Sequence, residues 1–358
     1  KGLPKSYFNH KSPAQLKWLL KQVTGVVLES TNAEALDNLY TAYPEVDFLQ
    51  ALMQLRSLNK MLDTYVKGIR EATCEDGRVR ASFNLHGTVT GRLSCSEPNL
   101  QNVPRDTYIK NIFRAFPGRI LVQLDYSQAE LRCLAYLSKD PWLTEVFVSG
   151  SDLHNRVAAE MYGEDFTKEQ RVRAKTLNFG IAYGLKPKSV MEKFGVSFSE
   201  ASNIIDRWFK PMPLVKAWIE TQRTNVLRGV PYVTEFGRTR HYVITDDNRS
   251  GVQNEAVNFP VSSIATDLTM CSLIEMQRLI DKSEFADRVW IVNNVHDSII
   301  FECDDDKEVV QWLVNIGCEV MRRMPLIKLP DCIVPFRADA EVGYNWGKLM
   351  SVEDYIAR

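Results

Sequence analysis

The chain has 358 residues, of which 45% are hydrophobic and 25% charged, so it can bury a sizeable core and is not a disordered tail. Lysine and arginine number 44 against 45 aspartates and glutamates, so net charge neither supports nor excludes nucleic-acid binding, which would need a local positive surface. The seven cysteines lack the paired close spacing of a zinc site or disulfide framework, which indicates a reducing compartment. No stretch approaches the roughly 18 apolar residues of a membrane span, and no apolar signal core opens the chain, so we expect a soluble, non-secreted protein.

The first third of the chain predicts helices followed by loops. A short helix over 12–22 runs into an extended or looped segment at 24–30. Apolar residues at helical spacing between 32 and 65, broken near Pro44, predict two further helices. Glycine, serine, asparagine, proline and arginine dominate 74–117, which favours loops and short strands.

The middle of the chain predicts a strand, an acid and then helices. An apolar strand at 120–124 meets Asp125, and helical spacing follows over 129–137. Long helical segments fill roughly 140–228, and after a turn-containing segment at 232–244 another helix is expected over about 263–280.

The end of the chain predicts a tight hairpin. Two apolar runs over 289–302 flank His296 and Asp297, which places an acid at the tip, where it is presented and not buried. A helix over about 307–323 and strand-like residues near 334–342 complete the chain.

Asp125 and Asp297 are the candidate metal ligands. Phosphoryl transfer uses metal ions on the attacking and leaving oxygens, and carboxylates are the usual ligands of magnesium. Adjacent antiparallel strands would hold both acids beside a nucleoside triphosphate. Each acid alone is a weak signal, because an aspartate at a strand end is mostly a turn or cap residue; the two patterns together are stronger.

The segment RVRAKTLNFGIAYG at 171–184 carries two cations and then two aromatic residues along one helical face. Such a face can neutralise triphosphate oxygens and offer flat apolar surface to a sugar and a base. For an isolated segment, a solvated basic face with two core aromatics would be the better interpretation. The four residues are Arg171, Lys175, Phe179 and Tyr183.

LVQLDYSQAELR at 121–132, RVRAKTLNFGIAYG at 171–184 and VHDS at 295–298 resemble, in order and separation, the three polymerase motifs of the family A (DNA polymerase I) enzymes. The resemblance extends over nearly the whole chain, through FNHKSPAQL at 8–16, TGRLSCSEPNLQNVP at 90–104, DLHNRVA at 152–158, FGRTRHY at 236–242 and EVGYNWGK at 341–348. It implies an α+β right-hand architecture with an antiparallel-sheet palm, helical fingers and a partial helical thumb. The expected divisions are a partial thumb and helical lead-in at 1–72, palm at 73–138, fingers at 139–265 with a nucleotide-binding helix at about 168–184, and palm again at 266–358.

The resemblance implies a role for each site residue. Asp125 and Asp297 would hold two Mg²⁺ ions, for which Mn²⁺ can substitute, with the backbone carbonyl of Tyr126 as a further ligand. Lys175 would also give a proton to the departing pyrophosphate, and Glu130 would act as a steric gate against ribose, paired with Tyr183. The implied nucleotide-binding residues are His154, Arg171, Lys175, Phe179, which lies against the sugar, Tyr183, Gln128 and Glu130.

The implied DNA contacts near the primer end are Arg92, Gln101 and Asn102, which test base-pair shape through the minor groove and backbone. Further candidates for the same surface are Arg114, Arg238, Arg240, Asn258 and His296.

The sequence departs from the family pattern at four positions. Ser298 follows the catalytic His296 and Asp297 where glutamate is usual. The other three are Ser262 for a common glutamine, Asn254 for a frequent arginine, and Ala129 for a bulkier apolar residue. Ser298, Ser262 and Asn254 remove no metal ligand, but together they predict a weaker hold on the primer terminus and a fidelity that differs from the family's. Ala129 leaves slightly more room beside Glu130.

The resemblance predicts a nucleotidyltransferase that acts on primer-template DNA and deoxynucleoside triphosphates in replication or repair, without membrane association. The chain starts within what looks like the second half of the thumb, so we expect no proofreading from it, and upstream exonuclease or other replication domains as partners. The expected location is the cytoplasm or nucleoid, or the host cytoplasm for a viral protein, with an organelle left open.

Two alternatives remain. A single-subunit RNA polymerase or a reverse transcriptase would share the palm and both aspartates, although Glu130 argues against ribonucleotide use. An inactive DNA-binding or assembly module would keep the fold without turnover, which retention of Asp125, Asp297 and the two cations disfavours.

Overall fold

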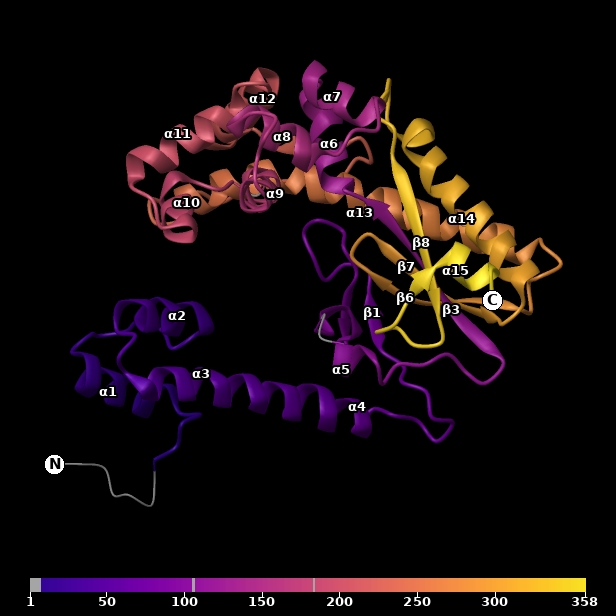
Figure 1. Cartoon of the computed structure of the whole chain (residues 1–358), viewed down its shortest axis with the longest axis horizontal. Coiled ribbons are helices and arrows are strands. Elements are labelled where there is room, and N and C mark those ends of the chain that lie inside the picture. Colours follow the sequence, from indigo (N-terminus) through magenta and orange to yellow (C-terminus); the bar gives the residue numbers. More distant parts are fainter. Residues whose placement is uncertain (1–7, 105–106, 183) are drawn as a thin grey trace. The chain divides into compact units, whose positions relative to one another are not determined.

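The structure is a computed structural model that describes residues 8–104, 107–182 and 184–358, without the side chains of residues 107 and 182. The chain divides into two compact units, Lys1–Arg80 and Ala81–Arg358 (Figure 1). The candidate site residues all belong to the second unit.

The first unit is helical, as the sequence predicts. Its helices are α1 (Pro13–Thr24), α2 (Ala33–Ala42), α3 (Asp47–Lys60), the π-helical stretch η1 (Met61–Lys67) and α4 (Gly68–Glu71). Ser12 caps α1 by accepting the backbone N–H of Gln15, and Pro13 occupies the first turn, where a missing N–H costs nothing. Leucines of α1, α2 and α3 form the core of this unit.

A five-stranded antiparallel sheet lies at the centre of the second unit, in the order β6-β7-β3-β8-β9. The strands are β3 (Arg119–Ser127), β6 (Val289–Val295), β7 (Ser298–Asp304), β8 (Arg337–Gly343) and β9 (Met350–Ser351). The predicted hairpin at 289–302 is confirmed as β6 and β7. The predicted terminal strand is confirmed as β8, and the segment before β3 forms the short strands β1 (Ser82–Asn84) and β2 (Ser94–Ser96), the turn η2 (Leu100–Asn102) and α5 (Thr107–Lys110).

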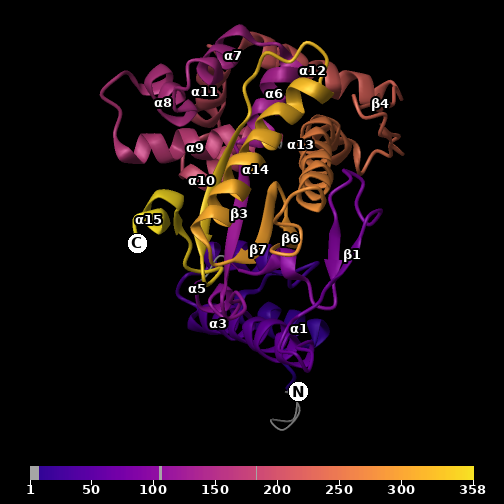
Figure 2. The ribbon, with the colours of Figure 1, turned by 90° about the vertical axis from the view of Figure 1, so that its right-hand side faces the viewer.

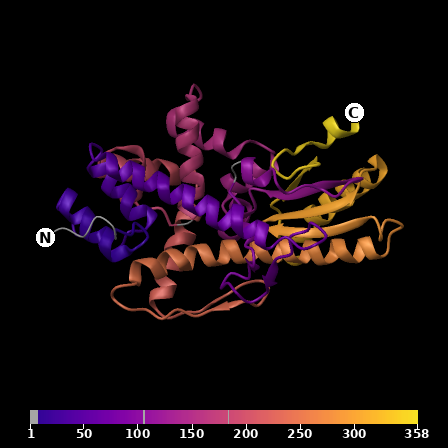
Figure 3. The same ribbon diagram turned by 90° about the horizontal axis from the view of Figure 1, so that it is seen from below.

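The two faces of β3 have different environments. Ile120, Val122, Leu124 and Tyr126 are buried on one face, because successive side chains of a strand alternate between the two sides of the sheet. Two long helices cover that face, α13 (Arg249–Asp281) and α14 (Lys307–Lys328), which run alongside the strands in Figures 2 and 3. The Tyr126 hydroxyl hydrogen-bonds to side chains or backbone of both helices. Gln123, Asp125 and Ser127 therefore point to the other face, which these helices leave open.

Among the described residues, seven helices lie between β3 and α13 along the chain, as the helical patterns over 129–137 and 140–228 predict. They are α6 (Ala129–Ser138), α7 (Pro141–Val148), α8 (Leu153–Tyr162), α9 (Lys168–Ala182), α10 (Pro187–Phe194), α11 (Phe198–Phe209) and α12 (Pro213–Leu227). The segment predicted at 232–244 contains a small hairpin of β4 (Tyr232–Val233) and β5 (Thr239–Arg240), and α15 (Val352–Ile356) closes the chain.

Helix α13 is longer than its sequence pattern indicates. It begins at Arg249 and not near 263, and it continues through Pro260 because buried residues such as Val252, Ala256 and Val257 pack along its first half. It crosses the division at 265 that the resemblance implies between fingers and palm. It is long and apolar enough to span a membrane, but 67% of its most apolar stretch is buried inside the structure, as in a core helix of a folded domain.

Candidate active site

The antiparallel register brings the two candidate metal ligands together. Asp125 lies near the end of β3 and pairs directly with Ser298, the first residue of β7. Asp297 precedes Ser298 in the two-residue turn that joins β6 to β7, and its backbone carbonyl accepts a 3.4 Å hydrogen bond from the Tyr126 N–H. The Ser298 hydroxyl donates a 2.6 Å hydrogen bond to Oδ1 of Asp125. The pairing of β3 with β7 therefore places the two acids next to each other at one end of the sheet.

The acid pair is under electrostatic stress. Burial and, second to it, the nearby charge of Asp125 together raise the pKa of the Asp297 carboxyl to about 6. Glu130 acts in the same direction, while Arg92 partly opposes it. Two carboxylates that cannot both ionise at low cost form a site that a cation would stabilise.

Two residues beside these acids have left-handed backbones that side chains rarely adopt. His296, directly before Asp297, has φ 56°, and Gln128, which precedes α6, has φ 56° and ψ 41°. Such strain persists where the surrounding structure fixes it, and it often occurs at functional sites. The side-chain Oε1 of Gln128 is buried and has no hydrogen-bond partner within the described part of the chain.

The described residues contain no group of three or more His, Cys, Asp or Glu side chains placed to hold a metal ion. The predicted ligand set does not need one, since it consists of two aspartates and the backbone carbonyl of Tyr126. Tyr126 follows Asp125 and hydrogen-bonds through its N–H to Asp297, and its buried ring and hydroxyl hold this part of β3 against α13 and α14.

The predicted triphosphate-binding residues lie on α8 and α9, which pack together. Arg171 forms a 2.9 Å ion pair with Asp152 and also donates to Asn155. Lys175, one turn further along α9, is exposed. Tyr183 lies outside the described residues.

His154 and Phe179 are neighbours at the interface of these two helices. The ring of Phe179 lies 5.6 Å from that of His154 and is 40% exposed, whereas His154 is 7% exposed. Burial lowers the pKa of the His154 imidazole, and Lys175 and Arg171 lower it further, against an opposing effect of Asp152. The ring is therefore neutral at pH 7.

Glu130 is the centre of a polar cluster that links three segments. Its Oε1 accepts a 2.8 Å hydrogen bond from Arg92 in the loop after β1 and another of 2.8 Å from Ser262 on α13. The Ser262 hydroxyl also lies 3.2 Å from Oδ1 of Asn258. Ser262, which stands where the family commonly has glutamine, thus hydrogen-bonds to Glu130, the predicted steric gate.

Four of the predicted DNA-binding residues line one pocket of about 240 Å³. Gln101 also donates a 3.1 Å hydrogen bond to the backbone carbonyl of Asn294 on β6, which ties the loop to the sheet. The pocket lies beside the acid pair because His296 precedes Asp297. The four residues are Arg92, Gln101, Asn102 and His296.

The other arginines are held differently. Arg238 pairs with Asp267 at 2.7 Å and packs against Gly91, whose φ of 82° and absent side chain allow the close approach. Arg240 pairs with Glu255 at 3.2 Å. Arg114 precedes β3 and is exposed, so the length of β3 separates it from Asp125.

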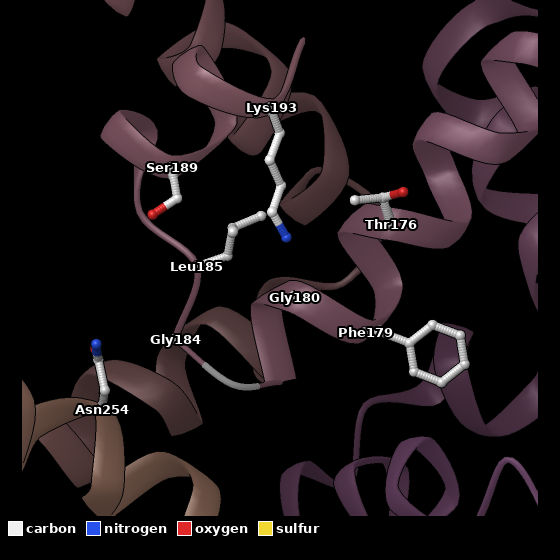
Figure 4. A pocket seen from close by; sticks show the side chains of 8 residues that line it. All are labelled: Thr176, Phe179, Gly180, Gly184, Leu185, Ser189, Lys193 and Asn254. Carbon is white, nitrogen blue, oxygen red and sulfur yellow. The ribbon is translucent and has the colours of Figure 1, made fainter. Parts of the chain in front are cut away.

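A second pocket, of about 480 Å³, lies where the end of α9 meets α10 and α13. Figure 4 shows Thr176 and Phe179 on α9, Ser189 and Lys193 on α10, and Asn254 on α13. Gly184 packs against Asn254 so closely that a side chain at that position would overlap it. Asn254, which stands where the family frequently has arginine, therefore fills the space next to Gly184, just after the end of α9.

Three residues with clear structural roles were not predicted from the sequence. Asn178 and Trp208 form buried hydrogen bonds that lead to His154, and Asn294 anchors both Gln101 and the turn before Ser298. Asn178 lies inside a motif that the sequence analysis singled out. Its polar side chain among apolar neighbours was the available signal, whereas nothing in the sequence distinguishes Trp208.

Comparisons with known proteins agree on one family. The model of DNA polymerase family A matches residues 2–348. DNA polymerase I of Rhizobium leguminosarum is 34% identical over 330 residues, which cover 88% of this chain and 32% of that protein. Thermostable DNA polymerase I of Thermus aquaticus is 34% identical, covering 88% and 38%, and the DNA polymerase of Bacillus phage SP01 is 32% identical, covering 87% and 36%.

A solved structure is similar as well. The POL domain of Pol1 from M. smegmatis, in complex with a DNA primer-template and dNTP, superposes with a TM-score of 0.83 at 28% identity, covering 95% of this chain and 61% of that one. The predicted α+β right-hand fold is confirmed by this likeness and by the antiparallel sheet. The chain spans about a third of the length of the curated relatives it matches.

Proposed function

The chain belongs to DNA polymerase family A, and from this premise we propose that it adds deoxynucleotides to a primer 3′ end on a DNA template, with release of pyrophosphate. The observation that carries the proposal is the register that places Asp125 and Asp297 at one end of the open sheet face. The complex of the Pol1 POL domain with primer-template and dNTP supports the choice of substrates.

Asp125 and Asp297 would hold the divalent metal ions that family A polymerases use, and we propose two Mg²⁺ ions with the Tyr126 carbonyl as a further ligand. The donor set fits, because both side chains offer hard oxygen atoms and the raised pKa of Asp297 reflects its burial together with the nearby charge of Asp125. When bound, the metal ions supply Lewis-acid activation of the primer hydroxyl and stabilise the charge of the triphosphate.

The chain's own residues position the nucleotide. Arg171 would exchange its bond with Asp152 for triphosphate oxygens, and the exposed Lys175 would neutralise charge and give a proton to the departing pyrophosphate. His154 would donate a hydrogen bond to a phosphate oxygen. Phe179 and Gln128 would contact the sugar and base side of the nucleotide, together with Tyr183.

Glu130 would exclude a ribose 2′-hydroxyl. Its carboxylate is held at one oxygen by both Arg92 and Ser262, so it cannot swing away without breaking two hydrogen bonds. This restraint supports a DNA polymerase over a single-subunit RNA polymerase, because a gate works only while its side chain stays in place.

The pocket beside His296 would receive the minor groove at the primer terminus. Arg92, Gln101 and Asn102 present donors that every base pair can accept there, so they would test pair shape and not sequence. Arg238, Arg240, Asn258 and Arg114 would contribute to DNA binding further from the acids, the first two after exchanging their carboxylate partners for phosphate.

Primer extension by the purified chain tests the proposal. We expect Mg²⁺-dependent addition of deoxynucleotides, suppression by chelator and a strong preference over ribonucleotides. Asp125→Ala and Asp297→Ala should abolish extension while DNA binding persists, and Glu341→Gln, an exposed acid on neighbouring β8, should extend normally. Preferred ribonucleotide addition would favour the RNA polymerase alternative, and DNA binding without any extension would favour the inactive module.

A further inference from the structure

Three buried side chains from three helices hydrogen-bond in series behind the candidate nucleotide site. The indole Nε1 of Trp208 on α11 lies 2.7 Å from Oδ1 of Asn178 on α9. The Nδ2 of Asn178 lies 2.8 Å from Nδ1 of His154 on α8. The exposed fractions of these residues are 2%, 0% and 7%, so water does not compete for the bonds.

The direction of this series is fixed at its tryptophan end. An indole N–H can only donate, so the carboxamide of Asn178 must turn its oxygen towards Trp208. Its NH₂ group then faces His154, and an NH₂ group can only donate. Nδ1 of His154 must therefore accept, which in a neutral imidazole places the ring proton on Nε2.

The same geometry disfavours a protonated ring. An imidazolium would carry a second N–H at Nδ1, directed at the N–H of Asn178. The charged groups that act on the ring are Asp152 on its own helix and Arg171 and Lys175 on α9, and two of these three are cations. Asn178, Phe179 and Trp208, which contact the ring or its partner, are uncharged.

We propose that Trp208 and Asn178 are positioning residues that hold His154 as the neutral tautomer with its proton on Nε2, presented as a single donor to a phosphate oxygen. This inference rests on the proposed triphosphate-binding role of His154. In this arrangement Arg171 and Lys175 supply the charge that attracts the triphosphate, and His154 supplies a hydrogen bond of fixed direction. Binding of the nucleotide then does not depend on the charge state of an imidazole between pH 6 and 8.

The tautomer can be observed directly by NMR. Long-range ¹H–¹⁵N correlation spectra of the full chain report which nitrogen of each imidazole carries the proton, and the chain has only five histidines. His154→Gln identifies the signals of His154. We expect a neutral ring with Nε2–H across pH 6 to 8, and a proton on Nδ1, or an imidazolium at pH 7, would overturn the proposal.

Asn178→Asp reverses the polarity of the series without changing its shape. The carboxylate can still accept from Trp208, but it must also accept from Nδ1–H, so the ring proton should move and the pKa of His154 should rise. The dNTP KM, nearly constant between pH 6 and 8 in the native chain, should then increase about tenfold as the ring loses its charge, while kcat changes less. A pH-independent KM in a folded Asn178→Asp variant would contradict the proposal.

Trp208→Phe tests the origin of the direction should Asn178→Asp not fold. Phenylalanine keeps most of the packing but frees the Asn178 amide to rotate, so a fraction of His154 should appear with its proton on Nδ1 and the dNTP KM should rise several-fold. Trp218→Phe on α12 is the matched control, because its indole makes no hydrogen bond to the described residues. An unchanged His154 spectrum in Trp208→Phe would remove Trp208 from the series.

The two readouts separate the inference from the proposed function. The NMR spectra need no catalysis, so the expected tautomer in a chain that never extends a primer would reject the polymerase activity. Normal extension with the opposite tautomer would reject the positioning role instead.

Discussion

The acidic and basic halves of the candidate site are built in different ways. Strand register brings Asp125 and Asp297 together, and burial and the charge of Asp125 raise the pKa of Asp297. Arg171 projects from a helix and is already paired with Asp152 at an exposed position. A bound cation would therefore relieve the repulsion between the two acids. In the basic half, Asp152 balances the charge of Arg171 until a more strongly charged anion replaces it.

Among variants that keep both aspartates, the largest effect should come from the basic half. Lys175→Ala removes both a charge and the proposed proton donor, so we expect single-turnover extension to slow by about 100-fold or more. Lys175→Arg restores the charge but donates a proton poorly, so it should recover dNTP affinity and leave the rate low. Rapid-quench extension, measured up to saturating dNTP, separates the dNTP affinity from the rate.

Lys168→Ala, two turns earlier on the same helix and also exposed, is the control and should extend at the native rate. Equal losses in the Lys168 and Lys175 variants would mean that α9 contributes only diffuse charge.

Removing the charge of Asp297 should stabilise the fold in a pH-dependent way, because that carboxylate is buried next to Asp125. The pKa of the Asp297 carboxyl is about 6 in the folded chain against about 3.8 when unfolded. The ionised carboxylate therefore does not destabilise the fold below pH 3.8, and it destabilises the fold fully above pH 6. Asp297→Asn should therefore raise the free energy of unfolding in chelator by about 3 kcal/mol at pH 8 and by progressively less towards pH 4.

Urea denaturation between pH 5 and 8 measures this gain. Asp339→Asn, an exposed acid directly opposite Asp125 on β8, should show no such trend. A gain of the same size at every pH would assign the effect to packing and not to charge.

Ser298 tests how precisely the acidic half is held. Its hydroxyl donates a short bond to Asp125, and Ser298→Ala removes that restraint on the carboxylate. We expect extension to slow by about tenfold at low Mg²⁺ and the loss to shrink as Mg²⁺ rises. Ser127→Ala, two residues from Asp125 on the same face of β3, should leave the Mg²⁺ dependence unchanged.

The smallest expected effect concerns choice of sugar. Ser262→Ala removes one of the two hydrogen bonds on Oε1 of Glu130, so discrimination against ribonucleotides should fall by about three- to tenfold while deoxynucleotide addition stays near native. Competition between dCTP and CTP opposite one template base gives the ratio. Ser263→Ala is a close control, because that neighbouring hydroxyl is equally buried and has no partner among the described residues.

The sequence predicted the acidic half well because its signals are local. Two patterns can each be recognised within about fifteen residues: the predicted strand that leads to Asp125, and the two apolar runs around His296 and Asp297. Antiparallel pairing then places the two acids together. The basic half was predicted only as a face of α9. Its links to Trp208 and Asp152 join residues 30 and 19 positions apart, and no periodicity encodes such pairs.

The start of α13 shows the same limit in the fold. Residues 249–262 include Gly251, Asn254 and Pro260, which locally argue against a helix, and burial of Val252, Ala256 and Val257 overrides them. Helix α14 likewise continues past the predicted end to Lys328, through Pro325, because Met324 and Pro325 are buried. Tertiary packing therefore decides helix ends where local propensity is weak.

A double-mutant cycle on Asp125 and Asp297 tests the central claim most directly. Single-turnover extension with Mg²⁺ is measured for Asp125→Ala, Asp297→Ala and the double variant, each with confirmed DNA binding. If the two acids hold one metal centre, either single change abolishes its function and the double variant is no slower than the singles. Losses that multiply in the double variant would show that the acids act independently, and would contradict the account.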